Sequence, residues 1–112
     1  MYTKCCDIVK LHFQEDKIAD FLSFFDTVKH KINSFPGCVG MQLLQDIHCP
    51  PIVMTYSYWD NENSLNEYRN SEMFGIVWST IKPWFFEKPE AWSLESYYDG
   101  FAENAATETK KR

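Results

Sequence analysis

Side chains alternate along the segment from residue 5 to residue 13. Val9, Leu11 and Phe13 project to one side, whereas the residues between them, ending with His12, project to the other. A period of two is typical of a β-strand that is buried on one face only. We therefore predict that this segment is the first strand.

The pattern then changes to a helical one. Apolar residues recur at intervals of three and four positions from Ile18 to Ile32, with acidic and basic residues over the remaining surface. That spacing predicts an amphipathic helix. The Pro36-Gly37 pair breaks a helix, so we expect this one to end near Asn33.

Two further alternating stretches flank a turn that contains two prolines. One runs from Val39 to the polar pair Gln45-Asp46, and the other runs from Ile52 to Trp59. The prolines remove backbone donors and stiffen the connection between the two stretches. Strands joined by so short a connection form an antiparallel hairpin.

Helical spacing returns after the third strand, but it is interrupted. Asp60, Asn61 and Asn63 provide side chains that cap a helix N-terminus. A polar Asn70-Ser71 step then separates a first helical piece from a second one, and Pro83 marks the end of the second piece or a kink in it. We predict a second helical region in two pieces.

A last alternating segment, residues 91–98, predicts a fourth strand. The order β-α-β-β-α-β is that of a ferredoxin-like α+β domain, a four-stranded antiparallel sheet with its helices on one face. We assign this domain to residues 1–100. Residues 101–112 are polar and rich in alanine and threonine, and we predict a disordered tail there.

A two-layer domain leaves one face of its sheet without helices. In the third strand, Val53 and Trp59 fall on one side and Tyr56 and Tyr58 fall on the other, so the uncovered face is not a polar one. Such a face needs a cover. We predict that the same face of a second subunit covers it, in a two-fold homodimer, with a monomer as the alternative.

Composition narrows the class of protein. The chain has 112 residues, 45% hydrophobic and 24% charged, which suits a single globular domain. Its net charge of -5 and the lack of a basic cluster argue against nucleic acid as a partner. No apolar run is long enough to cross a membrane, and no secretory leader is evident, so we expect a cytoplasmic protein without a membrane partner.

Sequence motifs for cofactors and metals are missing. The four cysteines show no CxxC spacing and are interpreted as free thiols, and the three histidines are far apart in sequence. Cys5 and Cys6 would point to opposite faces of a strand and could not bind one metal ion together. There is also no glycine-rich phosphate loop. We expect no metal and no cofactor.

Aromatic residues make up 17% of the chain, and many lie on elements that would bracket a cavity. Packing in the hydrophobic core can account for any single aromatic residue. The large number of aromatic residues is better explained by a pocket that binds a flat aromatic ligand. His12 is either a structural histidine or a base near neutral pH. The residues expected to bind a ligand are Trp59, Tyr68, Phe74 and Trp78.

Three motifs carry a resemblance to a known family. They are Phe35 to Gly40, Tyr58 to Asn61, and Tyr68 to Phe74. With them, the sequence from about Cys5 to Tyr98 resembles the antibiotic biosynthesis monooxygenase family of dimeric α+β barrel proteins. The resemblance implies the same order of elements, a dimer that packs sheet against sheet, and a pocket between the sheet and the helices.

That family includes enzymes that degrade haem. In the haem-degrading branch, the resemblance implies three functional residues: an asparagine on the first strand, a tryptophan in the second helical region and, further along the chain, a histidine that is an axial ligand of the haem iron. The matching positions here fall near Val9, Tyr68 and Trp78, so the axial histidine is missing. Haem binding or degradation is therefore the less favoured interpretation.

The family also includes cofactor-independent monooxygenases that act on aromatic polyketides or quinol-like compounds. A deprotonated phenol can itself donate an electron to dioxygen, so the protein supplies a dry pocket, a proton acceptor and a donor to the oxyanion. For that chemistry the candidate donors in this sequence are Tyr56, Tyr68 and Trp78, and His12 is the less favoured candidate acceptor.

Two functions from different classes follow. The leading hypothesis is a cofactor-independent monooxygenase for a small aromatic or quinone-like compound. The alternative is a non-enzymatic module that binds or senses a hydrophobic metabolite. A titratable side chain beside a ligand-sized cavity would favour the enzyme over the binding module.

Overall fold

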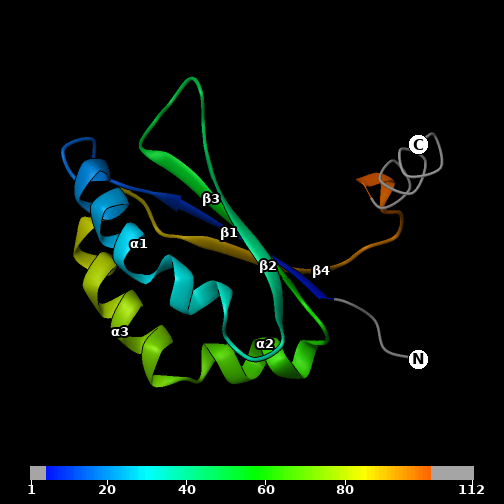
Figure 1. Ribbon diagram of the computed structural model, residues 1–112. Helices are drawn as coiled ribbons and strands as arrows, with labels where there is room; N and C mark the ends of the chain where they lie inside the picture. Colours follow the sequence, from blue (N-terminus) through cyan, green and yellow to red (C-terminus); the bar gives the residue numbers. More distant parts are fainter. Residues whose placement is uncertain (1–4, 102–112) are drawn as a thin grey trace, which may run out of the picture.

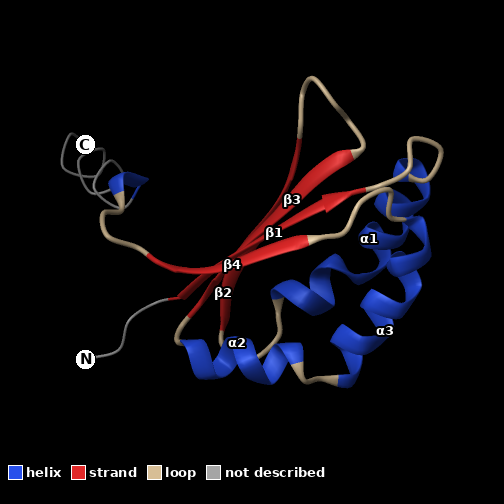
Figure 2. Ribbon diagram, turned by 180° about the vertical axis from the view of Figure 1, so that it is seen from behind, coloured by secondary structure: helices blue, strands red, loops and turns tan. Residues whose placement is uncertain are grey.

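The protein folds into one sheet layer and one helix layer (Figures 1 and 2). The structure is a computed structural model, and it describes residues 5–101. Each predicted strand and helix is present, and the second helical region is divided as expected. The elements are β1 Cys5–His12, α1 Ile18–Asn33, β2 Cys38–Gln45, β3 Ile52–Trp59, α2 Glu62–Arg69, α3 Glu72–Ile81, the short 3-10 helix η1 Lys82–Trp84, and β4 Glu90–Glu95.

The four strands form one antiparallel sheet in the order β2-β3-β1-β4. All three α-helices lie on the same side of it in Figure 2. This is the ferredoxin-like α+β fold that the sequence pattern predicts. No helix in the part of the chain that the structure describes has the length and apolar character needed to span a membrane.

Strand β4 is shorter than its sequence pattern suggests. It ends at Glu95, which pairs with Cys5, and does not reach Tyr98. Residues 96–101 then leave the sheet and extend away from the domain (Figure 1). The predicted tail, apart from residue 101, lies outside the described residues.

Local side-chain chemistry explains where the helices begin. The Asn61 side chain accepts a hydrogen bond from the backbone N–H of Ser64 and caps α2. Ser71 does the same for α3 through the N–H of Phe74. After α1, Gly37 has a φ of 89°, a left-handed conformation that favours glycine and turns the chain into β2.

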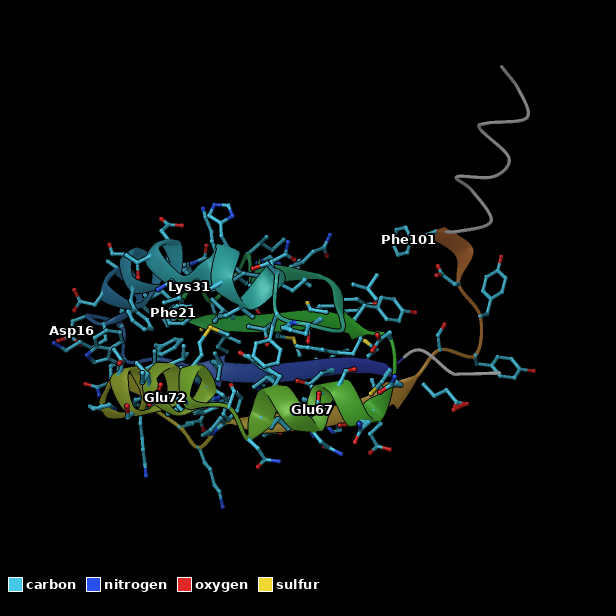
Figure 3. The ribbon with its side chains drawn as sticks, turned by 60° about the horizontal axis from the view of Figure 1, so that its bottom comes forward. Asp16, Phe21, Lys31, Glu67, Glu72 and Phe101 are labelled. Carbon is cyan, nitrogen blue, oxygen red and sulfur yellow. The ribbon has the colours of Figure 1, made fainter. Side chains whose placement is uncertain are left out.

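Two apolar clusters lie at opposite ends of the helix-facing side of the sheet. At one end, Trp59 and Cys5 pair across β3 and β1 and pack under Leu65 of α2. At the other end, Figure 3 shows Phe21 projecting from α1 toward the sheet, where it is 3% exposed. That second cluster consists of Leu11, Phe13, Phe21, Val53 and Ile81.

The opposite side of the sheet, which we call the open face, has no helices over it. Cys6 lies on this side and Cys5 on the other, as predicted for neighbours in a strand. Trp92 and Leu94 of β4 are 42% and 45% exposed on this face. The register places these apolar and aromatic side chains on the open face: Ile8, Leu44, Met54, Tyr56, Tyr58, Trp92 and Leu94.

Candidate functional site

A cavity of about 120 Å³ lies between the sheet and the helices. Side chains of β1, β2, β3 and β4 form its floor, and α1, α2 and α3 supply its walls. The four residues predicted to bind a ligand all line it. The full lining is Asp7, Val9, Leu11, Phe21, Phe24, Phe25, Val28, Ile32, Met41, Thr55, Ser57, Trp59, Tyr68, Arg69, Phe74, Val77, Trp78, Ile81 and Ala91.

The predicted aromatic residues form one continuous series of ring contacts. The Trp59 ring is fully buried and stacks on Tyr68, with 5.1 Å between centroids. Tyr68 meets Phe74 edge to face at 5.1 Å, and Phe74 meets Trp78 at 5.7 Å. Each ring thus packs against its neighbours and also lines the cavity, so the core-packing interpretation and the ligand-pocket interpretation both apply to these residues.

A row of polar side chains crosses the sheet between the two apolar clusters. Asp7 of β1 pairs with Ser57 of β3 on one side and with Ser93 of β4 on the other. Asp7 and Ser57 are both 7% exposed. Ser57 Oγ accepts a hydrogen bond of 2.9 Å from the indole N–H of Trp59. The cavity is therefore apolar over most of its lining and polar at this row.

Arg69, the last residue of α2, reaches over this polar row. Its Nη2 donates to Asp7 Oδ1 at 2.7 Å and to Ser93 Oγ at 2.9 Å. The Asp7 side chain is 9% exposed and the Arg69 side chain 33%. A mostly buried carboxylate is thus held by a guanidinium that still reaches solvent.

Burial sets the acidity of the titratable groups in the cavity. Loss of solvation raises the pKa of Asp7, and the neighbouring charge and hydrogen bond of Arg69 only partly oppose that change. Burial, with the Asp7 carboxylate and Cys38 nearby, also raises the pKa of Tyr68 to about 12. Asp7 is thereby a stronger base than an exposed aspartate, and Tyr68 stays a neutral hydroxyl that can donate.

His12 and Tyr56, the other two predicted catalytic residues, lie on the open face and do not line the cavity. The Nδ1 atom of His12 is 2.6 Å from Glu87 Oε1, beside a polar depression of about 360 Å³. Tyr56 lies against Cys6 and Tyr58. Burial and the Cys6 contact raise the pKa of Tyr56 to about 12. The sheet separates both residues from the aromatic series.

Candidate metal ligands do not gather anywhere between residues 5 and 101: no group of three or more histidine, cysteine or acidic side chains is placed to hold an ion. All four cysteines are free thiols, as predicted. Cys5 is packed beneath Trp59, and burial raises its thiol pKa. The polar chemistry of the cavity therefore comes from the carboxylate, the guanidinium and hydroxyls.

The sequence reasoning missed the polar row and the residue above it. Asp7 has the same alternation phase as Val9 and Leu11, so a charged residue on the buried face of β1 was a visible signal. Arg69 had no comparable signal, because its contact with Asp7 joins residues 62 positions apart. The resemblance implied a pocket between the sheet and the helices, but no residue of α1 was named for its lining.

Solved structures show the same fold at low sequence identity. A candidate antibiotic biosynthesis monooxygenase from Nitrosomonas europaea superposes with a TM-score of 0.80 at 15% identity, covering 88% of this chain and 94% of that one. A similarly described protein from Caulobacter crescentus gives 0.79 at 17%, covering 87% and 92%. The protein PA3566 from Pseudomonas aeruginosa gives 0.77 at 15%, covering 88% and 98%.

Comparison of the sequence with known sequences and family models identifies the family of this chain. No curated protein matched the sequence. The model of one family, described as antibiotic biosynthesis monooxygenase, matches residues 6–75, which is more than half of the chain. The matched segment runs from β1 into α3 and carries the polar row residues Asp7 and Ser57 together with Arg69. The chain belongs to the antibiotic biosynthesis monooxygenase family.

Proposed function

We propose that this protein is a cofactor-independent monooxygenase that acts on a small aromatic or quinone-like compound. The observation that carries the proposal is the cavity, which has aromatic walls and contains, at the polar row, the titratable side chain of Asp7. Trp59, Tyr68, Phe74 and Trp78 would hold a flat ring, as their ring contacts and position suggest. Membership of the family supports the reaction class.

The reaction can be written without a redox group on the protein. A hydroquinone and dioxygen give a hydroxyquinone and water, so dioxygen is the oxidant and the organic substrate supplies the electrons. The protein excludes water, orients the ring and stabilises the oxyanion. The Tyr68 hydroxyl and the Trp78 indole N–H suit the last task, because neither has a hydrogen-bond partner within residues 5–101.

The binding module is the weaker alternative. It would need only an apolar cavity, whereas this cavity also contains a mostly buried carboxylate with a raised pKa. Haem is disfavoured by size as well as by the missing histidine at Trp78. A cavity of about 120 Å³ does not accommodate a porphyrin unless its lining residues move apart.

The open face supports the second proposal, a homodimer. Its apolar and aromatic side chains cover adjacent positions of all four strands. An apolar patch of this kind marks an interaction surface, and two copies of one face can meet around a two-fold axis. His12 and Tyr56 would then lie at or near the subunit interface, and a part in the reaction would require the second subunit.

The test of the reaction is oxygen uptake with hydroquinone and isotopically labelled dioxygen. The expected product is a hydroxyquinone that carries one labelled oxygen atom, with labelled water and no hydrogen peroxide. Uptake no faster than in protein-free buffer, or uptake that yields only peroxide and unlabelled quinone, would overturn the proposal. Spontaneous oxidation produces the second pattern, so the label separates it from catalysis.

A matched pair of variants ties the activity to the cavity. Trp78→Phe keeps a ring in the cavity wall but removes the indole N–H, so turnover is expected to fall. Trp84→Phe makes the same change where the ring packs edge to face on Phe24 and does not line the cavity. Equal turnover in the two variants would argue against Trp78 as a donor.

A further inference from the structure

The polar end of the cavity has hydrogen-bonding capacity that the protein does not use. Asp7 Oδ1 accepts from Arg69 Nη2, whereas no hydrogen bond joins Asp7 Oδ2 to another described residue, and this second oxygen keeps some accessible surface. Within the same residues, Arg69 makes both of its contacts through Nη2, which leaves Nε and Nη1 unpaired. One acceptor and two cationic donors therefore remain at the end of an otherwise apolar cavity.

A purely structural ion pair would not be expected to look like this. Removing a carboxylate from water carries a penalty that an ion pair repays only when the remaining oxygen and N–H groups are also satisfied. Here no protein group within residues 5–101 pairs with Asp7 Oδ2 or with two of the Arg69 nitrogens, all of which keep accessible surface, and the raised pKa of Asp7 indicates that loss of solvation outweighs the attraction of Arg69. The pair has the features of a site prepared for a polar group that enters with a ligand.

The unused groups define the chemistry of that polar group. A carboxylate oxygen accepts a proton, and guanidinium N–H groups stabilise the negative oxygen that results. A hydroxyl acidic enough to ionise satisfies both, whereas an ether oxygen offers no proton to Asp7. Ring contacts on the cavity wall require that this hydroxyl be attached to a flat apolar body.

The volume of the cavity limits that body to one ring. An apolar protein cavity of roughly 150 Å³ is known to hold benzene. The cavity here, at about 120 Å³, is of that order. Fused systems of three rings would need the walls to move, because the clusters at both ends are closely packed.

We infer that Asp7 and Arg69 recognise the ionisable hydroxyl of a phenol or hydroquinone with a single ring, Asp7 accepting its proton and Arg69 binding the phenolate. The step breaks the O–H bond of the ligand, moves the proton to Asp7 Oδ2 and leaves the electron pair on the ligand oxygen. The inference rests on the proposed function because it concerns the same cavity. It does not require the oxygenation reaction, since binding of the phenol consumes no dioxygen.

The test uses para-nitrophenol, whose phenolate absorbs at longer wavelength than its neutral form. This phenol is too electron-poor to reduce dioxygen, so binding is measured without turnover. At a pH about one unit below its own pKa, the bound ligand is expected to show the phenolate band. para-Nitroanisole, its methyl ether, is expected to bind at least about tenfold more weakly.

Proton counting then identifies the acceptor. Calorimetric titration in buffers of different ionisation heat measures how many protons are released to the buffer when the ligand binds. The wild type is expected to release none while the phenolate forms, because Asp7 retains the proton. Asp7→Asn is expected to release about one proton per phenolate formed. Asp26→Asn, which changes an exposed ion pair with Lys29, is the control and should match the wild type.

Arg69→Met tests the other half of the site. The bound ligand is expected to stay neutral in this variant, because no cation remains to stabilise the phenolate. Three results would each overturn the inference: equal binding of the phenol and its ether, a neutral bound phenol in the wild type, or one proton released by the wild type as well as by Asp7→Asn. The comparison of phenol with ether needs only the wild type, so it stands even if a variant misfolds.

These outcomes separate the inference from the proposed function. A protein that binds the phenolate but consumes no dioxygen with hydroquinone retains this inference and loses the monooxygenase proposal. A protein that oxygenates hydroquinone but binds the phenol and its ether equally well retains the function and loses this inference.

Discussion

Asp7 differs from the neighbours on its own strand because it places a charge among buried apolar residues. Its carboxylate is mostly buried, its pKa is raised, and only one of its two oxygens, Oδ1, has a hydrogen-bond partner in the described part of the chain. Such groups occur where a protein gives up some stability for function. The arrangement predicts that removing the charge stabilises the fold.

The first prediction concerns the pH dependence of that effect. Because the folded-state pKa of Asp7 lies above its model value of 3.8, its ionisation disfavours the folded state as pH rises through the folded pKa. Well below 3.8 the carboxyl is neutral in both states and carries no penalty. Thermal unfolding should therefore show Asp7→Asn gaining in Tm over the wild type, by a few degrees, between about pH 4 and pH 7.

The same melts on Asp26→Asn serve as the control for a general change in net charge. That variant should gain no such advantage, since Asp26 forms an exposed pair with Lys29 at 3.0 Å. If Asp7→Asn instead loses Tm relative to the wild type as pH rises, the ion pair with Arg69 is a net stabilising contact.

The second prediction concerns the Tyr68 hydroxyl. The ring stacks on Trp59 and supports the core, whereas the hydroxyl has no hydrogen-bond partner within residues 5–101. Tyr68→Phe should therefore leave the free energy of unfolding within about 0.5 kcal/mol of the wild type. If the hydroxyl donates to the oxyanion, oxygen uptake with hydroquinone should fall by about 100-fold.

Tyr58→Phe is the control for this change, because Tyr58 lies on the open face and takes no part in the cavity. Chemical denaturation and oxygen uptake on the two variants distinguish the roles. A Tyr68→Phe protein that unfolds more easily but keeps its turnover would show that the hydroxyl is structural.

At the scale of elements, the corner between α2 and α3 positions the site. Arg69 is the last residue of α2, and α3 begins three residues later, at Glu72. Ser71 Oγ accepts from the N–H of Phe74 at 3.2 Å and donates to the carbonyl of Tyr68 at 2.6 Å. One side chain thus connects the end that carries Arg69 to the helix that carries Trp78.

The third prediction follows from that double contact. Ser71→Ala should lower the free energy of unfolding by about 1 kcal/mol, because α3 loses its N-terminal cap. Ser79→Ala, which removes only a hydroxyl bonded to the Ile76 carbonyl on the exposed side of α3, should change it by less than about 0.5 kcal/mol. Urea denaturation compares the two, and equal losses would argue that Ser71 has no special role at the corner.

At the scale of the whole molecule, the two faces of the sheet have different tasks. The helix-facing side holds the cavity, and the open face carries the apolar side chains that support a dimer. The segment after β4 extends from the domain, with Phe101 88% exposed and apart from the sheet in Figure 3. A second copy on the open face would remove apolar surface from water without affecting the lining of the cavity.

The fourth prediction tests that surface. Leu94→Glu places a charge on the open face of each subunit, so sedimentation should show a monomer where the wild type is a dimer. Ile76→Glu makes the same change on the exposed side of α3, and it should leave the dimer intact. A wild type that stays monomeric at concentrations of tens of micromolar, or a Leu94→Glu dimer as stable as that of the wild type, would contradict the dimer proposal.

The sequence by itself determined the elements and their order. Helix α1 ends at Asn33 and the second helical region breaks at Asn70-Ser71, as predicted, because caps and breakers act through neighbouring residues. The division of β3 into two sides also followed from its alternation, since Trp59 and Val53 share a side and are both fully buried, whereas the structure decided that this side faces the helices. Periodicity is a local property, and it can be read without knowledge of contacts.

Tertiary structure alone decided which side chains meet. The sequence suggested His12, Tyr56, Tyr68 and Trp78 as catalytic candidates, and only the folded structure shows that Tyr68 and Trp78 line one cavity while His12 and Tyr56 lie on the open face. The contact between Asp7 and Arg69 depended on the packing of a helix over a strand that lies 62 residues away in sequence. Register and helix placement are set by the whole core, so no local pattern specifies them.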